Sequence, residues 1–196
     1  MKVYPETTPR DEYLAAQIAR SRAKFNFCKV SPADVALYRR LVPDPGEILC
    51  LGVRNGTEVD RFRLAYEGGR WPWSPRRPVM VQGVEINPDA IRPDVLIASF
   101  DDLPRAFVGM WGLVFSNSLD HALDVVATAR HWRTMVRPGG HVILALPEIA
   151  ALTVTDRVAL DLEDVRRLFA PATLVYYHHE GSVPDGYTQI VLRLPP

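Results

Sequence analysis

The chain has 196 residues, of which 47% are apolar and 23% charged, a composition typical of one ordinary globular domain. Lysine plus arginine (23) balances aspartate plus glutamate (23), which argues against a nucleic-acid-binding protein, because such proteins carry a basic excess. No apolar run approaches the roughly 18 residues of a membrane span, and the polar start MKVYPETTPRDEY is unlike a secretory signal peptide.

The chain contains two cysteines, Cys28 and Cys50. Cys50 lies in an apolar, strand-like run, and buried free thiols are common in cytosolic proteins. We therefore expect no disulfide and a cytoplasmic protein.

The first part of the chain is predicted to be helical. Residues 11–29 place Leu14 and Ile18 on one apolar stripe. Residues 31–42 follow as a second helix, since Ser31 suits the N-cap and is followed by proline. We expect the two helices to form an N-terminal cap.

From residue 45 onward, short apolar runs alternate with helical stretches, and RPGG at 137–140 is expected to end one helix. Helices separating the strands imply a parallel sheet covered on both faces, and the short last connection implies an antiparallel hairpin. The predicted fold is α/β, a doubly wound, seven-stranded, mostly parallel sheet with an antiparallel C-terminal hairpin, over 45–196 after a helical cap over 1–44. Strands are predicted at 47–52, 79–86, 94–100, 112–117, 141–146, 173–180 and 187–194, and helices at 57–67, 119–136 and 160–170.

The stretch EILCLGVRNGTEV, from residue 47, is a candidate ligand-binding turn. Ligands of doubly wound sheets lie beyond the carboxyl ends of the strands. Gly52 would allow a tight turn, Gly56 would let the next helix pack close to the strand, and the helix start at Thr57 would offer free N–H groups. Taken alone, Gly-x-x-x-Gly after a strand is equally typical of a plain tight turn.

Glu85 ends the next strand, in VQGVEINPDA. A carboxylate at this place can accept hydrogen bonds from both hydroxyls of a ribose. The alternative is a solvated strand-end glutamate. The two signals in this order favour a nucleoside ligand, and Arg54 in place of a middle glycine disfavours a nicotinamide or flavin cofactor.

The order of the motifs LCLGVRNGTEV, VEINP, ASFDDLP, GLVFSNSLDHAL and RPGGHVIL resembles the class I S-adenosylmethionine-dependent methyltransferases, nearest to members with DHAL after the fourth strand. The resemblance covers about residues 45–147, and the tail hairpin matches the last two strands of the family. It implies the seven-stranded fold already predicted, S-adenosylmethionine as cofactor, and methyl transfer as the reaction.

The resemblance also implies roles for individual residues. The turn Gly52, Val53, Arg54, Asn55 and Gly56 would wrap the methionine portion of the cofactor. Glu85 would hold the ribose, Ile86 and Phe100 would contact the adenine, and Ser99 takes the place of an adenine-binding aspartate. Ser116 and Asn117 would border the methionine portion and the substrate.

Three positions depart from the family pattern. Cys50 stands where the family has an acidic residue two before the first glycine. Arg54 replaces the middle glycine and brings a cation near a sulfonium, unless it pairs with the carboxylate of the cofactor. Ser99 in place of aspartate removes one adenine contact. Each departure weakens the match in the cofactor turn or the adenine site.

Methyl transfer from a sulfonium needs a general base only if the acceptor is a protonated hydroxyl, amine or thiol. His121 is the candidate base, with Asp120 beside it to orient the ring or bind substrate. The alternative is that both residues begin a helix and His121 is packed. No Cys/His cluster has zinc spacing, so we predict no metal.

The loop 67–78, EGGRWPWSPRRP, carries two tryptophans and three arginines. It is either a recognition surface for an anionic or aromatic partner or a stiff surface excursion.

The preferred function is methyl transfer to a small molecule or glycan, because the short cap leaves little room for a substrate domain. One alternative is a non-catalytic binding or scaffold protein with the same fold, and another is a nicotinamide-dependent oxidoreductase.

Overall fold

A computed structural model describes residues 1–4, 8–67, 79–147, 152–179 and 187–196. Its central sheet is built from β2 (Ile48–Leu51), β3 (Val81–Glu85), β4 (Val95–Ile97), β5 (Trp111–Ser116), β6 (Val136–Pro147), β8 (Thr173–His179) and β9 (Tyr187–Arg193). The spatial order is β4-β3-β2-β5-β6-β9-β8. Strands β2 to β6 pair in parallel, and β9 is antiparallel to β6 and β8. The predicted doubly wound, seven-stranded fold with its antiparallel hairpin is confirmed.

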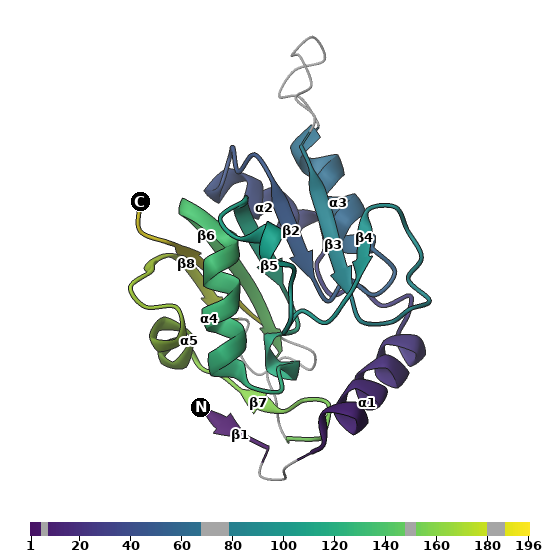
Figure 1. Cartoon of the computed structure of the whole chain (residues 1–196). Coiled ribbons are helices and arrows are strands. Elements are labelled where there is room, and N and C mark those ends of the chain that lie inside the picture. The colour runs from purple at the N-terminus through teal and green to yellow at the C-terminus, as the bar shows by residue number, and fades with distance from the viewer. Residues whose placement is uncertain (5–7, 68–78, 148–151, 180–186) are drawn as a thin grey trace.

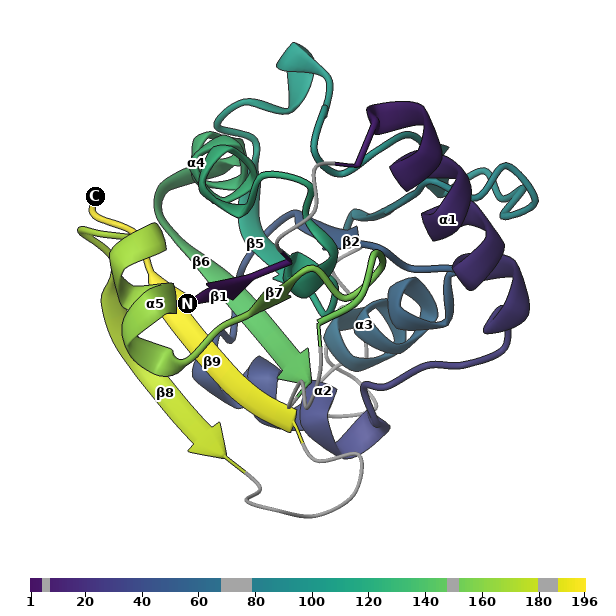
Figure 2. The ribbon, with the colours of Figure 1, turned by 90° about the horizontal axis from the view of Figure 1, so that it is seen from below.

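Helices cover both faces of the sheet (Figures 1 and 2). On one face lie α2 (Pro32–Leu41) and α3 (Thr57–Glu67), and on the other α4 (Val125–Met135) and α5 (Leu162–Leu168). The apolar run of β2 serves both layers, because successive side chains of a strand point to opposite faces. Ile48 and Cys50 pack with α2 and α3, whereas Leu49 and Leu51 pack with α4 and α5.

Local capping signals set the starts of several helices. The Ser31 side chain accepts from the Asp34 N–H and the Asp34 side chain accepts from the Ser31 N–H, so a capping box opens α2 as its sequence predicts. Asp124 accepts from two N–H groups of α4, which therefore begins at Val125 rather than at 119. Leu119–His121 instead form a short 3-10 helix, η2.

RPGG at 137–140 lies within β6, so this strand begins at Val136 and not at the predicted residue 141. The helix does end just before it, at Met135. β5 and β6 pair at Trp111 with Val136 and again at Leu113 with His141, so the four residues of RPGG form an irregular bulge inside the strand.

The first helix, α1 (Arg10–Ala23), is shorter than predicted and buries a different face. Tyr13, Gln17 and Ser21 are its buried residues, at i, i+4 and i+8, whereas Leu14 and Ile18 are only half-buried. The helix lies beyond the arrowheads of the parallel strands, at the carboxyl edge of the sheet (Figure 1). Its polar buried face therefore meets the edge where ligands of such sheets bind.

Two further short strands, which the sequence did not predict, lie at the same edge. β1 (Lys2–Val3) pairs antiparallel with β7 (Val158–Ala159), and the Tyr4 N–H donates to the Arg157 carbonyl. They cross in front of the sheet in the view from below (Figure 2). Within the described ranges, every helix is too short or too polar to span a membrane.

Candidate functional site: a pocket at the carboxyl edge of the sheet

The turn after β2 approaches the segment that follows β5 so closely that a side chain at its first residue would clash. Gly52 has φ +77°, and a Cβ built on it would lie 2.4 Å from Ser118 Oγ. Its N–H donates to the Val84 carbonyl at 2.9 Å, which holds the turn against β3. The backbone of Gly52 therefore forms part of a surface that a larger residue would fill.

Gly56, the second glycine of the turn, has a different role from the predicted one. It has φ +81°, and a Cβ there would meet the side chain of Arg92 at 2.9 Å. Close packing of α3 on the sheet depends instead on Gly83 in β3, where a Cβ would meet Val53 and Val59 at 2.9 Å. Asn55 caps the helix by accepting from the Thr57 N–H.

We expect Gly52→Ala to lower the free energy of unfolding by about 2–3 kcal/mol, from the positive φ and the clash with Ser118. Gly109→Ala is the matched control: Gly109 has φ +69°, but nothing lies within 4 Å of its added Cβ, so the cost should be about 1 kcal/mol. In a Ser118→Gly background the cost of Gly52→Ala should fall to the control value. Urea denaturation of the wild type, the three single variants and the double variant measures these costs. Equal costs at Gly52 and Gly109 would contradict the close approach.

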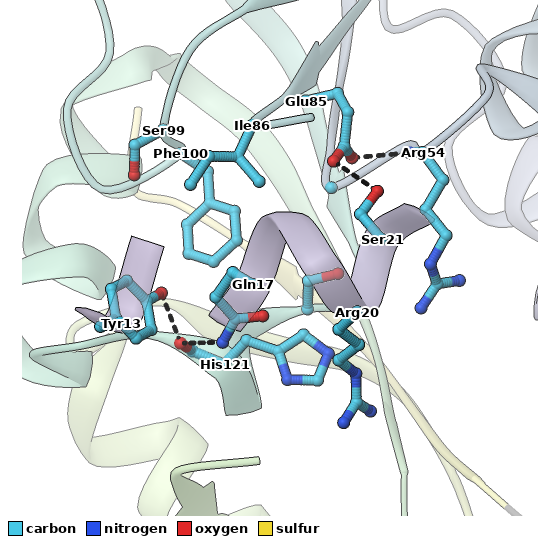
Figure 3. A pocket seen from close by; sticks show the side chains of 12 residues that line it. Tyr13, Gln17, Arg20, Ser21, Arg54, Glu85, Ile86, Ser99, Phe100 and His121 are labelled. Carbon is cyan, nitrogen blue, oxygen red and sulfur yellow. Dashed lines mark hydrogen bonds between the residues drawn. The ribbon is translucent and has the colours of Figure 1, made fainter. Parts of the chain in front are cut away.

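Glu85 is buried at the end of β3 with its carboxylate directed into the pocket (Figure 3). Its Oε2 accepts from the Arg54 N–H at 2.7 Å, and its Oε1 from the Asn87 N–H at 3.0 Å and the Ser21 hydroxyl at 2.9 Å. A buried carboxylate is stable in this position because several donors point at it. It is therefore not the solvated strand-end residue of the alternative interpretation.

Arg54 reaches the left-handed region with φ +48°, as only a few per cent of non-glycine residues do. Its guanidinium lies 5.2 Å from the centre of the Phe27 ring and donates to the Phe27 carbonyl at 3.2 Å. The backbone N–H of Arg54 thus serves Glu85, while its charge is held by the segment after α1.

The pocket has a volume of about 40 Å³. Of the predicted cofactor residues, Val53, Asn55, Gly56, Ser116 and Asn117 are not among its walls. Ser116 and Asn117 lie behind it: the Ser116 hydroxyl donates to the Leu51 carbonyl and accepts from the Ser118 N–H. The pocket is lined by Tyr13, Gln17, Arg20, Ser21, Gly52, Arg54, Glu85, Ile86, Ser99, Phe100, Ser118 and His121.

Ser99 and Phe100 form one wall of the pocket, and residues behind that wall hold both of them in place. Phe100 lies edge-on to Trp132 with ring centres 5.6 Å apart, and the indole N–H of Trp132 donates to the Phe100 carbonyl. Ser99 donates to Asp101 Oδ2 at 3.3 Å. Burial raises the pKa of Asp101, against hydrogen bonds from Thr128 and Ser99.

His121 lies at the opposite end of the pocket, in η2. Its Nδ1 is 2.8 Å from the Thr155 carbonyl, 3.4 Å from Asp120 Oδ2 and 3.6 Å from Asp156 Oδ1. Because a carbonyl only accepts hydrogen bonds, Nδ1 carries the hydrogen and Nε2 is left as the acceptor.

Two carboxylates with different surroundings flank this histidine. Asp120 is 2% exposed, and neither of its oxygens has a hydrogen-bond partner among the residues that the structure describes. Burial raises the pKa of Asp120, against the attraction of His121. Although burial opposes it, Arg20 lowers the pKa of Asp156 by donating to both oxygens, at 2.5 and 2.7 Å. The lowered pKa of Asp156 favours its ionised form, whereas the raised pKa of Asp120 disfavours ionisation. Asp120 is not among the residues that line the pocket.

Among the described residues, Asp120, His121 and Asp156 form a group whose ligand atoms could surround a metal ion, all lying within 4.8 Å of one another. However, Arg20 already occupies both oxygens of Asp156, and Nδ1 is bonded to a carbonyl. Two of the three groups are therefore already engaged by partners within the chain.

Sequence reasoning missed the part of the pocket that α1 supplies. The Tyr13 hydroxyl donates to the His121 carbonyl at 2.7 Å, and Gln17 donates to the Thr155 carbonyl at 3.0 Å. Together with Arg20 and Ser21, these residues form one polar face of the helix (Figure 3). The four-residue spacing of Tyr13, Gln17 and Ser21 was the signal available in the sequence. It was missed because these residues are polar, whereas the helix was read from its apolar stripe. The loop 67–78 lies outside the described residues beyond Glu67.

No protein-family profile and no curated protein matches this sequence. Solved structures do match its fold. A Burkholderia thailandensis 1,6-didemethyltoxoflavin-N1-methyltransferase with bound S-adenosylhomocysteine aligns with TM-score 0.73 at 11% identity, covering 100% of this chain and 94% of that one. The [4+2]-cyclase SpnF aligns with TM-score 0.67 at 12% identity, covering 100% and 99%.

The N-methyltransferase NodS from Bradyrhizobium japonicum, in complex with S-adenosylhomocysteine, aligns with TM-score 0.60 at 14% identity, covering 93% of this chain and 97% of that one. The chain has the fold of the class I S-adenosylmethionine-dependent methyltransferases.

Proposed function

We propose that the protein binds S-adenosylmethionine in this pocket and transfers its methyl group to a small-molecule acceptor. The observation that carries the proposal is Glu85: a buried carboxylate at the end of β3, facing the Gly52 turn across the carboxyl edge of the sheet. In doubly wound sheets a carboxylate at this point binds ribose hydroxyls. The structures that align over nearly the whole chain include two methyltransferases with bound S-adenosylhomocysteine.

The residues of the pocket fit such a cofactor. Gly52 and the backbone of Arg54 would border the methionine portion, with Ser118 beside Gly52. Glu85 would take the ribose, and Ile86 and Phe100 offer apolar surface for a purine. Ser99, held by Asp101, supplies a polar group at the rim of that surface. Cys50 packs into the core behind the turn, so no acidic side chain of β2 reaches the site.

The cofactor supplies an electrophilic methyl group on a sulfonium, so the protein must align an acceptor and remove its proton where it has one. We assign the proton transfer to Nε2 of His121. Thr155 fixes the required tautomer, and Asp120 and Asp156 lie close enough to Nδ1 to stabilise an imidazolium. A small-molecule acceptor is supported by the 1,6-didemethyltoxoflavin bound to one aligned structure, of which this chain covers 94%.

Calorimetric titration of the purified chain with S-adenosylmethionine and S-adenosylhomocysteine tests the proposal. We expect binding in the micromolar range, about −8 kcal/mol, with NADH giving no heat. Folded protein that binds neither sulfur compound, even when Ser21 is replaced by alanine, would favour a non-catalytic binding protein. Binding of NADH alone would favour the oxidoreductase.

A further inference from the structure

We propose that α1 is a lid whose Ser21 hydroxyl takes the place of a ribose hydroxyl on Glu85, so that the cofactor binds by displacing this helix. The inference rests on the proposed function, because it assumes that Glu85 is the ribose-binding residue. It adds a competing group within the chain and an order of binding.

The pocket is too small for a nucleoside while α1 is in place. Its volume of about 40 Å³ is far below the roughly 300 Å³ at which ligand pockets begin. Four of its twelve lining residues come from α1: Tyr13, Gln17, Arg20 and Ser21. A nucleoside can therefore reach Glu85 only if this helix moves.

Glu85 accepts from two backbone N–H groups and from one side chain of α1. Arg54 and Asn87 donate backbone N–H groups that belong to the turn after β2 and to the end of β3. Ser21 alone donates from α1. When α1 moves away, the two backbone donors keep the carboxylate in position, and the place vacated on Oε1 is open to another hydroxyl. A ribose hydroxyl makes the same kind of bond.

The helix α1 is attached to the rest of the protein mainly by polar contacts. No residue of α1 belongs to either apolar cluster of the described core, whereas α4 contributes four buried apolar side chains to one of them. Tyr13 is the one large buried side chain of α1, and its hydroxyl is hydrogen-bonded. Water can replace hydrogen bonds at a small net cost, unlike buried apolar contacts. Apart from the buried Tyr13 ring, α1 is held over the pocket by polar contacts, which can be exchanged for water.

The same helix face also contacts the acceptor end of the pocket. Arg20 holds both oxygens of Asp156, and Gln17 donates to the Thr155 carbonyl next to it. Asp156 and Thr155 are the groups that contact Nδ1 of His121. Displacing Ser21 from Glu85 therefore also loosens the cover over His121, which predicts that the cofactor binds first and the acceptor second.

Ser21→Ala tests the lid directly, because it removes the competing hydroxyl without adding bulk. We expect this variant to bind S-adenosylhomocysteine about tenfold more tightly, since hydrogen bonds to charged groups are the stronger ones. In stopped-flow fluorescence, the binding rate of the wild-type chain should reach a plateau with rising ligand, set by opening of the lid. The plateau should rise in Ser21→Ala. Trp132, bonded to the pocket residue Phe100, supplies the signal.

Two variants are the controls. Ser21→Thr keeps the hydroxyl and should bind like the wild type. Arg22→Ala, on the same helix, removes only an ion pair with Asp89 between two side chains more than half exposed and should change affinity little. Equal affinity of Ser21→Ala and wild type, with rates linear in ligand, would overturn the lid and leave the proposed function standing. Absence of binding in every variant would overturn the proposed function itself.

Discussion

Replacing Glu85 by glutamine weakens binding of S-adenosylhomocysteine by at least about 100-fold, because two charge-assisted hydrogen bonds to the ribose are lost. The amide that replaces the carboxylate presents an NH₂ group where Arg54 and Asn87 already direct N–H donors. At least one donor is then left facing another donor. Calorimetry measures the change in affinity.

Glu85→Gln also weakens the contact of Glu85 with Ser21, which by itself would help the lid to open. Glu85→Gln should therefore reduce the affinity for S-adenosylhomocysteine by a larger factor in Ser21→Ala protein than in the wild type. Glu163→Gln is the matched control, since that side chain is 56% exposed on α5. Unchanged affinity in a folded Glu85→Gln variant would show that the ribose is bound elsewhere. A denaturation curve confirms that the variant is folded.

Replacing His121 by glutamine lowers the rate of methyl transfer to a protonated acceptor by about 10²–10⁴-fold, the usual contribution of a general base. Glutamine still fills the place and can donate to the Thr155 carbonyl, but its side chain cannot take up a proton. Affinity for S-adenosylhomocysteine should change little, because the Tyr13 hydroxyl bonds the backbone carbonyl of His121 rather than its ring.

Methyl-labelled S-adenosylmethionine offered with a panel of phenols, thiols and amines provides the assay, followed by mass spectrometry of the products. His178→Gln, on the exposed strand β8, is the matched control and should retain the wild-type rate. A His121→Gln variant that transfers at the wild-type rate would remove His121 from the mechanism. The acceptor would then need no base.

The sheet and the cofactor edge could be predicted from sequence because their signals are local. The apolar run of β2, the glycine after it and the carboxylate at the end of β3 each lie within a few residues of a strand end, and parallel strands bring their carboxyl ends to one edge. Gly52 and Glu85 were found in this way, and both line the pocket.

The lid could not be found in the same way. The search for an apolar stripe gave Leu14 and Ile18, whereas α1 buries Tyr13, Gln17 and Ser21. Those polar side chains are buried because their partners, Glu85 and the carbonyls of His121 and Thr155, come from distant parts of the chain. Asp156 likewise lies in a segment without a motif. Such pairings depend on the tertiary fold and leave no periodic pattern in the sequence.

The pairing of β1 with β7 gives the lid a fixed anchor on its N-terminal side, and α2 packs into the core on its C-terminal side. A helix tethered at both ends can swing but cannot diffuse away, so Ser21 behaves as an intramolecular ligand whose effective concentration at Glu85 is of the order of millimolar. A soluble ligand must outcompete that tethered group. The apparent dissociation constant of the cofactor then depends on the connections to α1 as well as on the pocket. Shortening or lengthening these connections would change the cofactor concentration at which half of the sites are occupied.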